Sequence, residues 1–140
     1  MTAIIICCHG ALAAGFESAL HMILGSTPLV IALPFNEGEG LMDLREKICG
    51  AVAASSCGSA LIFTDLFGAS PANASAAALF DLPVPAVVVT GANAAMILEA
   101  TIARDQYEDV EALAAYLADI GRGNIRVITK ETVLKAGENA

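Results

Sequence analysis

The sequence predicts an α/β domain built on a doubly wound, mainly parallel sheet with the strand order 2-1-3-4. Three observations support this fold class. The length of 140 residues suits one domain. Hydrophobic residues make up 56% of the chain and charged residues only 16%, which excludes disorder and coiled coils. Short apolar runs also alternate with longer segments of helical spacing, as they do in βαβ units with right-handed crossovers.

Four of the apolar runs predict strands that are buried on both faces, as in a parallel sheet covered by helices on each side. These runs span residues 3–8, 29–33, 60–64 and 84–90. A fifth, short strand is predicted at residues 125–129, at the edge of the sheet, and a polar tail follows over residues 130–140. The chain 1–140 is therefore predicted to be a single domain, with its core between about residues 2 and 129.

Five helices are predicted between the strands, from apolar residues at helical spacing and from start and stop signals. These signals are Leu12, Phe16, Leu20 and Ile23, with Gly25 as a stop; Leu41, Leu44, Ile48 and Val52; Ser70-Pro71, running to about Phe80; Gly91-Ala92-Asn93; and Val110 to Ile120. Ser70 is predicted to cap the third helix, because its side chain accepts backbone hydrogen bonds and Pro71 suits the first helical position. Asn93 is predicted to cap the fourth helix.

The third and fourth helices carry no charge over residues 72–80 and 93–98. A helix that is apolar all round is usually buried all round. In a domain of this size a second subunit is the simplest cover for such helices, because monomers rarely expose extended apolar patches. The sequence therefore predicts a homodimer, and the alternative is a pair of weakly apolar, alanine-rich surface helices.

Charge excludes two classes of partner. Fifteen acidic residues against seven basic ones give a net charge of −8. Such a domain lacks the basic surface that nucleic acids and anionic membranes bind. The first basic residue is Arg45, so the N-terminus lacks the positive segment of a signal peptide, and prolines and a glycine interrupt the uncharged stretch 82–98. We therefore expect a cytoplasmic protein with no direct membrane insertion.

The four cysteines, Cys7, Cys8, Cys49 and Cys57, are interpreted as small buried apolar residues. They include no Cys-x-x-Cys spacing, and the chain has only two histidines. Cys7 and Cys8 are neighbours on a predicted strand, so their side chains face opposite ways and cannot bind one tetrahedral ion. The sequence predicts neither a metal site nor a cofactor.

The candidate site follows from the fold class. Ligands of a doubly wound sheet bind beyond the carboxyl ends of the strands, where the strand order reverses. In the order 2-1-3-4 this crevice lies between the first and third strands, which end in His9 and Asp65. A carboxylate beside a histidine fixes which ring nitrogen carries the proton and leaves the other nitrogen free as a nucleophile or base.

An anion cradle is predicted beside this pair. The third helix begins at Gly68-Ala69-Ser70, and the first begins just after Gly10. Free N–H groups at helix N-termini suit a phosphoryl group. The predicted catalytic residues are therefore His9 and Asp65, and the predicted phosphate-binding residues are Gly10, Gly68, Ala69 and Ser70. Without a basic clamp or a metal set, the pattern favours transfer between proteins over nucleotide hydrolysis.

Two segments resemble a known family: Ile4-Ile5-Ile6-Cys7-Cys8-His9-Gly10 and Phe63-Thr64-Asp65-Leu66-Phe67-Gly68-Ala69-Ser70-Pro71. They are similar to the EIIA component of the mannose/fructose/sorbose class of the bacterial phosphoenolpyruvate:sugar phosphotransferase system. Residues 93–99 and 121–123 extend the resemblance, which covers roughly residues 2–128. The chain departs from the family at Ala69, where Gly is usual, and at Asn36-Glu37-Gly38, where the family often has Pro-Gly.

The resemblance implies an activity. His9 would accept a phosphoryl group from the phosphocarrier protein HPr and pass it to a histidine of an EIIB partner. Asp65 would hold the ring of His9 from its other nitrogen, and Ser70 with neighbouring amides would contact the phosphate. The resemblance also implies a homodimer in which the strand 125–129 crosses to the partner's sheet. The role would lie in sugar uptake or in regulation.

Three alternatives stay open at the level of sequence. One is the EIIA-like phosphotransfer subunit of a dihydroxyacetone kinase, which has the same histidine chemistry and another acceptor. The second is a response-regulator receiver phosphorylated on aspartate, which the ending Cys8-His9-Gly10 of the first strand disfavours. The third is a non-catalytic, dimeric signalling module that binds an anion in the same crevice.

Overall fold

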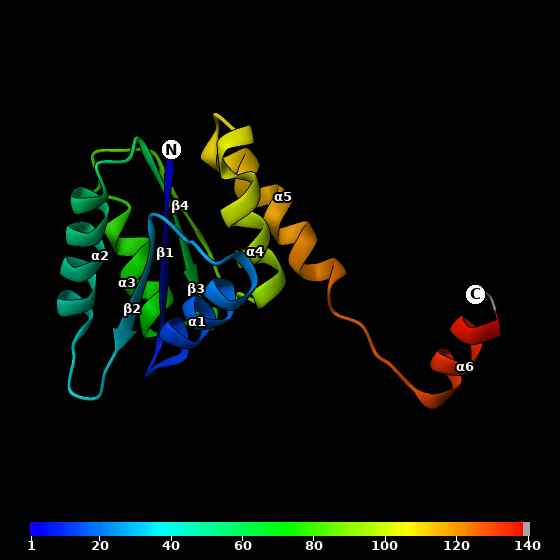
Figure 1. The fold of residues 1–140 in the computed structure, drawn as a ribbon. Coiled ribbons are helices and arrows are strands. Elements are labelled where there is room, and N and C mark those ends of the chain that lie inside the picture. Colours follow the sequence, from blue (N-terminus) through cyan, green and yellow to red (C-terminus); the bar gives the residue numbers. More distant parts are fainter. Residues whose placement is uncertain (139–140) are drawn as a thin grey trace.

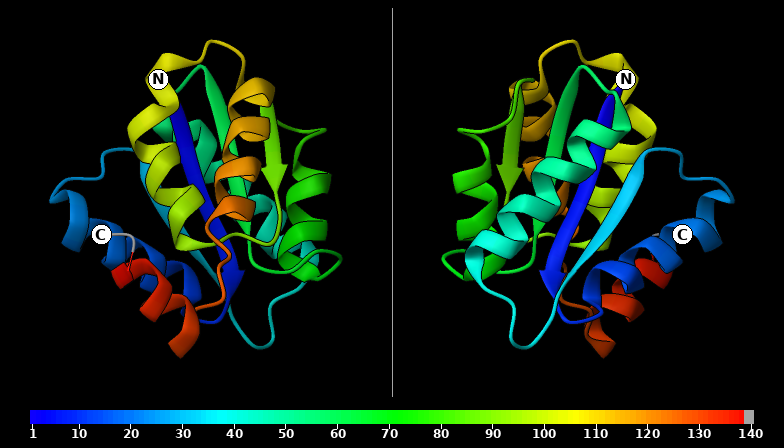
Figure 2. Two further views of the ribbon diagram at one scale, coloured as in Figure 1. Left: turned by 90° about the vertical axis from the view of Figure 1, so that its right-hand side faces the viewer. Right: turned by 90° about the vertical axis from the view of Figure 1, so that its left-hand side faces the viewer.

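The computed structural model describes residues 1–138, in which helices cover both faces of a four-stranded sheet (Figure 1). The strands are β1 (Thr2–His9), β2 (Val30–Phe35), β3 (Ser59–Thr64) and β4 (Ala86–Val89). The helices are α1 (Leu12–Leu24), α2 (Leu41–Ser55), α3 (Ser70–Ala78), α4 (Ala94–Ala103), the short 3-10 helix η1 (Arg104–Gln106), α5 (Val110–Gly123) and α6 (Lys130–Glu138). α2 and α3 cover one face, and α1, α4 and α5 cover the other (Figure 2).

The sheet confirms the predicted fold class. Its strand order is β2-β1-β3-β4, and every pair of neighbouring strands is parallel. β1 lies between β2 and β3, with Ile4 opposite Val30 on one side and Leu61 on the other. β4 is shorter than the predicted run 84–90, because the backbone bends at Pro83 and Val84. Pairing with β3 begins only at Pro85, whose carbonyl accepts the Ala60 N–H at 3.0 Å.

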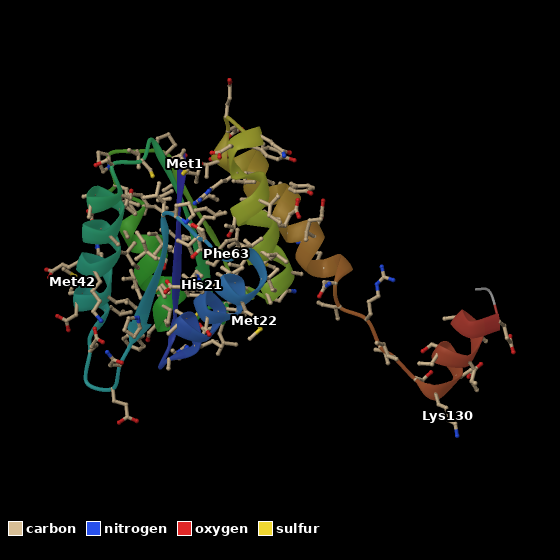
Figure 3. The ribbon with its side chains drawn as sticks, viewed as in Figure 1. Met1, His21, Met22, Met42, Phe63 and Lys130 are labelled. Carbon is tan, nitrogen blue, oxygen red and sulfur yellow. The ribbon has the colours of Figure 1, made fainter. Side chains whose placement is uncertain are left out.

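The sheet divides the core into two layers. Ile4, Ile6 and Cys8 of β1 face α1, α4 and α5, whereas Ala3, Ile5 and Cys7 face α2 and α3. This alternation follows from the two-residue period of a strand. Phe63 of β3 is fully buried in the first layer (Figure 3). The interpretation of Cys7 and Cys8 as buried apolar residues is confirmed, and Cys49 and Cys57 are half-buried.

Two of the predicted helix signals are confirmed and one is wrong. Gly25 ends α1 with a φ of 77°, which glycine adopts without strain. Asn93 caps α4, because its Oδ1 accepts the Met96 N–H at 3.1 Å. Ser70 does not cap α3. The extended backbone that a cap requires falls on Ala69, so the helix starts at Ser70 and its hydroxyl makes no capping bond.

The uncharged helices α3 and α4 do not need a second subunit to cover them. Most of α3 is buried in this chain, where α2 and the sheet cover it, and α4 packs between α1 and α5. Chain-internal burial thus accounts for their lack of charge. Large apolar side chains are nevertheless exposed beyond α3 and after α5; they are Leu79, Phe80, Ile125, Val127 and Ile128.

The C-terminal segment differs from the prediction. Residues 125–129 form no strand within the described chain, because a strand needs a hydrogen-bonding partner and this segment leads away from the body (Figure 1). The expected polar tail 130–140 contains the helix α6. Its start is fixed by reciprocal hydrogen bonds between Thr129 and Thr132, which act as a cap. Residues 139 and 140 of that tail lie outside the described residues.

Arg104 holds the edge of the sheet at which β1 begins, opposite to the strand ends that carry His9 and Asp65. This side chain is almost fully buried and donates hydrogen bonds to the carbonyls of Thr2 and Pro28. It thereby joins the start of β1 to the connection between α1 and β2. No helix within residues 1–138 is long and apolar enough to cross a bilayer.

Thr64 supplies a stability prediction, because its hydroxyl is buried and has no hydrogen-bond partner among residues 1–138. Such a group costs about 1–3 kcal/mol of desolvation. We expect Thr64→Val to raise the free energy of unfolding by about 1 kcal/mol in urea titrations. Thr101→Val is the matched control, since the Thr101 hydroxyl bonds the Ile97 carbonyl at 3.0 Å and its loss lowers stability. A destabilised Thr64→Val protein would show that the hydroxyl has a partner.

Candidate functional site

The strand order brings His9 and Asp65 together, as predicted. β1 and β3 are parallel neighbours, so their carboxyl ends meet at one edge of the sheet. The register pairs Cys7 with Thr64, which places the residues that follow side by side. In Figure 1 this edge lies at the lower end of the sheet, next to the start of α1 and the loop after β2.

Two hydrogen bonds join His9 to Asp65. The Nδ1 of the His9 ring lies 2.7 Å from Oδ2 of Asp65, and the His9 backbone N–H donates to the same oxygen at 3.0 Å. The other carboxylate oxygen, Oδ1, accepts the Leu66 N–H at 3.0 Å. The Asp65 side chain is only 10% exposed and the His9 side chain is 43% exposed. The carboxylate is therefore anchored while the ring remains open to solvent.

These contacts decide the state of the ring. Burial acts to raise the pKa of the Asp65 carboxyl, but the hydrogen bonds from the His9 ring and backbone outweigh it and hold that pKa below its usual value. An ionised carboxylate only accepts hydrogen bonds, so the proton lies on Nδ1 of His9. The opposite nitrogen, Nε2, makes no hydrogen bond within residues 1–138. The ring is thus held with an available lone pair.

The residues predicted to bind an anion, Gly68 to Ser70, lie in the turn between Asp65 and the first residue of α3. Gly68 has a φ of 79°, a value that favours glycine, and its carbonyl accepts a hydrogen bond from the Asn73 side chain at 3.1 Å. The N–H groups of Gly68 and Ser70 have no partner within the described residues, whereas that of Ala69 makes a long bond to Leu66 at 3.4 Å. The positive end of α3 therefore carries donors that an anion can use.

Gly10 is engaged differently from its prediction. Its N–H donates to the Phe35 carbonyl at 2.9 Å, so in this structure that amide is not free for an anion. The bond joins the end of β1 to the end of β2. Its φ of 56° turns the chain from β1 into α1.

An open cleft of about 440 Å³ lies beside the ring, lined by His9, Gly10, Phe35, Asn36 and Glu37. The rings of Phe35 and His9 pack in a T-shaped arrangement, with ring centroids 5.9 Å apart. The sequence reasoning missed Phe35, Glu37 and the supporting Asn73. The strand order contained the signal for Phe35, because β2 ends next to β1.

Neither a reactive thiol nor a metal-binding cluster accompanies His9 at this edge within residues 1–138. Burial, and secondarily the charge of Asp65, raises the pKa of the Cys8 thiol to about 12, and its side chain is inaccessible. Cys8 is therefore not a thiolate nucleophile. Across residues 1–138, no three His, Cys, Asp or Glu side chains are grouped to hold a metal ion.

Comparison with known proteins gives a consistent result. The family model described as the PTS system fructose IIA component, EIIA-man, matches residues 3–118. The chain is 37% identical over 99 residues to the sorbose-specific EIIA component of Lacticaseibacillus casei, covering 71% of each chain. It is 30% identical over 135 residues to the mannose-specific EIIAB component of Escherichia coli, covering 96% of this chain and 42% of that protein. The crystal structure of an EIIA component from Streptococcus agalactiae superposes with a TM-score of 0.85 at 29% identity, covering 91% and 97% of the two chains.

The lowered pKa of Asp65 predicts how stability depends on pH. A carboxyl with a lower pKa in the folded state stabilises the fold above its unfolded pKa, near 3.8, and loses that contribution as pH falls through the folded value. We therefore expect Asp65→Asn to be less stable than the wild type near pH 7, and the difference to shrink below about pH 4. Urea titrations across this range measure it.

The matched control is Asp119→Asn, because the exposed Asp119 pairs only with Arg122 on the surface of α5. This variant should differ little from the wild type at either pH. A stability difference for Asp65→Asn that stays constant between about pH 7 and pH 3 would contradict the assigned coupling.

Proposed function

The chain belongs to the EIIA-man family of phosphotransferase-system IIA components, and from that premise we propose that His9 carries a phosphoryl group between two proteins. The donor is phospho-HPr and the acceptor is a histidine of an EIIB component. Both would meet this domain in the cytoplasm. The observation that supports the proposal best is the 2.7 Å contact from Nδ1 of His9 to Asp65, which leaves Nε2 free.

The chemical step uses this ring state. The lone pair of Nε2 attacks phosphorus, and the P–N bond to the donor histidine breaks as the new P–N bond forms. The donor ring leaves neutral, because its other nitrogen keeps a proton. The phosphorylated His9 ring gains positive charge, which the Asp65 carboxylate stabilises through Nδ1–H. Transfer to EIIB runs through the same steps in reverse.

The turn before α3 supports the phosphoryl group. We assign its oxygens to the free N–H groups of Gly68 and Ser70 and to the Ser70 hydroxyl, with Ala69 completing the turn. Ser70 is available for this because it does not cap the helix. The family usually has Gly where this chain has Ala69. The φ of Ala69 is −88°, a value that any residue adopts, so the side chain does not strain the turn.

The test is phosphorylation of the pure protein by phosphoenolpyruvate, enzyme I and HPr, followed by intact mass. We expect one added phosphoryl group that is lost in acid and retained in base, and none on His9→Ala. His21→Ala is the matched control, since His21 is the other histidine and lies exposed on α1 (Figure 3). Phosphate on the His9→Ala protein, or none on the wild type where another EIIA is labelled, would contradict the proposal.

We also propose that the protein is a homodimer in which residues 125–129 pair with the partner's sheet. The support is the family resemblance together with two features of the chain. Ile125, Val127 and Ile128 are exposed although they are large and apolar. β4 is an edge strand with an unpaired side, where an added strand would find hydrogen-bonding groups.

Sedimentation measures this assembly. We expect the wild type to sediment as a dimer at micromolar concentration and Val127→Asp to shift toward monomer, because the charge would be buried at the added strand. Met22→Asp is the control, with Met22 on α1 (Figure 3). Met22 is 87% exposed and Val127 is 82% exposed, so each substitution places a charge at an exposed apolar position of this chain. A wild-type monomer, or equal effects of both changes, would contradict the exchange of strands.

A further inference from the structure

The cleft beside His9 carries a carboxylate that the proposed transfer does not use. Glu37 lines this cleft with His9, Gly10, Phe35 and Asn36. Its side chain is exposed and makes no hydrogen bond or ion pair within the described residues. Glu37 is thus the one acidic residue in the lining of this cleft, and Asp65 lies behind the ring of His9.

The loop that carries Glu37 is held in place on both sides. The Asn36 N–H donates to Oε1 of Glu39 at 2.9 Å, and Oε2 of Glu39 lies 2.6 Å from Nζ of Lys47 on α2. Lys47 also donates to the Pro34 carbonyl at 3.2 Å. At the strand end, the Gly10 N–H bond to Phe35 joins the base of the loop to the residue that follows His9. The residues on both sides of Glu37 are therefore held in place, which keeps the loop beside the strand end that carries His9.

A phosphoryl group on His9 would add negative charge to a cleft that already holds a carboxylate and no basic side chain of this chain. A phosphoryl group carries close to two negative charges at neutral pH. All seven basic side chains lie within the described residues, and none lines the cleft. Lys47 reaches the loop, but Glu39 and the Pro34 carbonyl already occupy its ammonium group. The phosphoryl group would meet Asp65 and Glu37 without a cation of this chain at hand.

We propose that Glu37 docks a Lys or Arg side chain of the protein that exchanges the phosphoryl group with His9. This inference rests on the proposed function and names the chemistry of the partner. The partner's cation would lie between Glu37 and the phosphoryl oxygens, neutralise both during transfer, and depart with the partner. The P–N bonds form and break as described above, and Glu37 itself takes no proton and forms no bond to phosphorus.

Glu37 then acts as a specificity residue. A protein with a basic side chain beside its own histidine gains an ion pair at the moment of transfer. A protein or small anion without one meets an uncompensated carboxylate. Charges at the rim of an interface act mainly on the association rate and on its salt dependence. The effect of Glu37 should therefore appear in the second-order rate constant.

The experiment compares two phosphoryl donors on the wild type and on Glu37→Gln. One donor is phospho-HPr, a protein; the other is phosphoramidate, which has no basic side chain. We expect Glu37→Gln to slow the reaction with phospho-HPr about fivefold at low salt and to weaken its salt dependence. The reaction with phosphoramidate should not slow and should rise by up to about twofold, because a like charge is gone. Glu46→Gln, an exposed carboxylate of α2 outside the cleft, is the control.

Slowing that is confined to the protein donor supports the docking role. Equal slowing with both donors would assign Glu37 to the chemistry of the ring and overturn the proposal. An unchanged rate with phospho-HPr, or the same loss in Glu46→Gln, would overturn it as well. Failure of the proposed function would be a separate result. It would appear as phosphorylation of the His9→Ala protein, in which Glu37 is unchanged.

Discussion

The hydrogen bond between His9 and Asp65 depends on one topological constraint, which is that β1 and β3 are parallel neighbours at the centre of the sheet. The two residues are 56 positions apart, and only strands that run the same way can bring both to one edge. The same constraint explains why the two central strands, β1 and β3, are almost completely buried while the edge strands β2 and β4 are only partly so, because a parallel sheet has a helix layer on each face. It also places the starts of α1 and α3 beside the ring, since each follows directly from the end of a strand.

Much of this architecture could be predicted from local patterns. The apolar runs of β1 and β3 and the positions of His9 and Asp65 after them follow from the two-residue strand period and the topology of α/β sheets. The structure differs from the predictions where contacts beyond the local sequence decide the outcome. Ser70 has every property of a cap, but the extended residue is Ala69. Residues 125–129 have the composition of a strand but pair with no strand within residues 1–138, so a strand there depends on a partner outside this chain.

The residues that support the site could not be predicted from local sequence patterns, for a related reason. Asn73 acts on Gly68 across a turn of five residues, and Lys47 acts on Glu39 and Pro34 from a different element. Such contacts depend on the path of the loops, which has no periodic signal. The buried Arg104 is similar, because nothing in its sequence neighbourhood indicates that Thr2 and Pro28 lie beside it. These residues fix the positions of the loops and strand ends around His9 and Asp65, the two residues that sequence reasoning proposed for the chemistry.

The placement of two thiols next to His9 bears on how sensitive the site is to oxidation. Cys7 and Cys8 immediately precede His9, yet both are fully buried in the core, and burial raises the pKa of each thiol to about 12. Peroxides and alkylating agents attack accessible thiolates, and neither thiol is accessible or ionised. Oxidative damage at this edge therefore has to begin elsewhere. Thiol oxidation is therefore not expected to disturb the His9 ring, although two cysteines directly precede it in the chain.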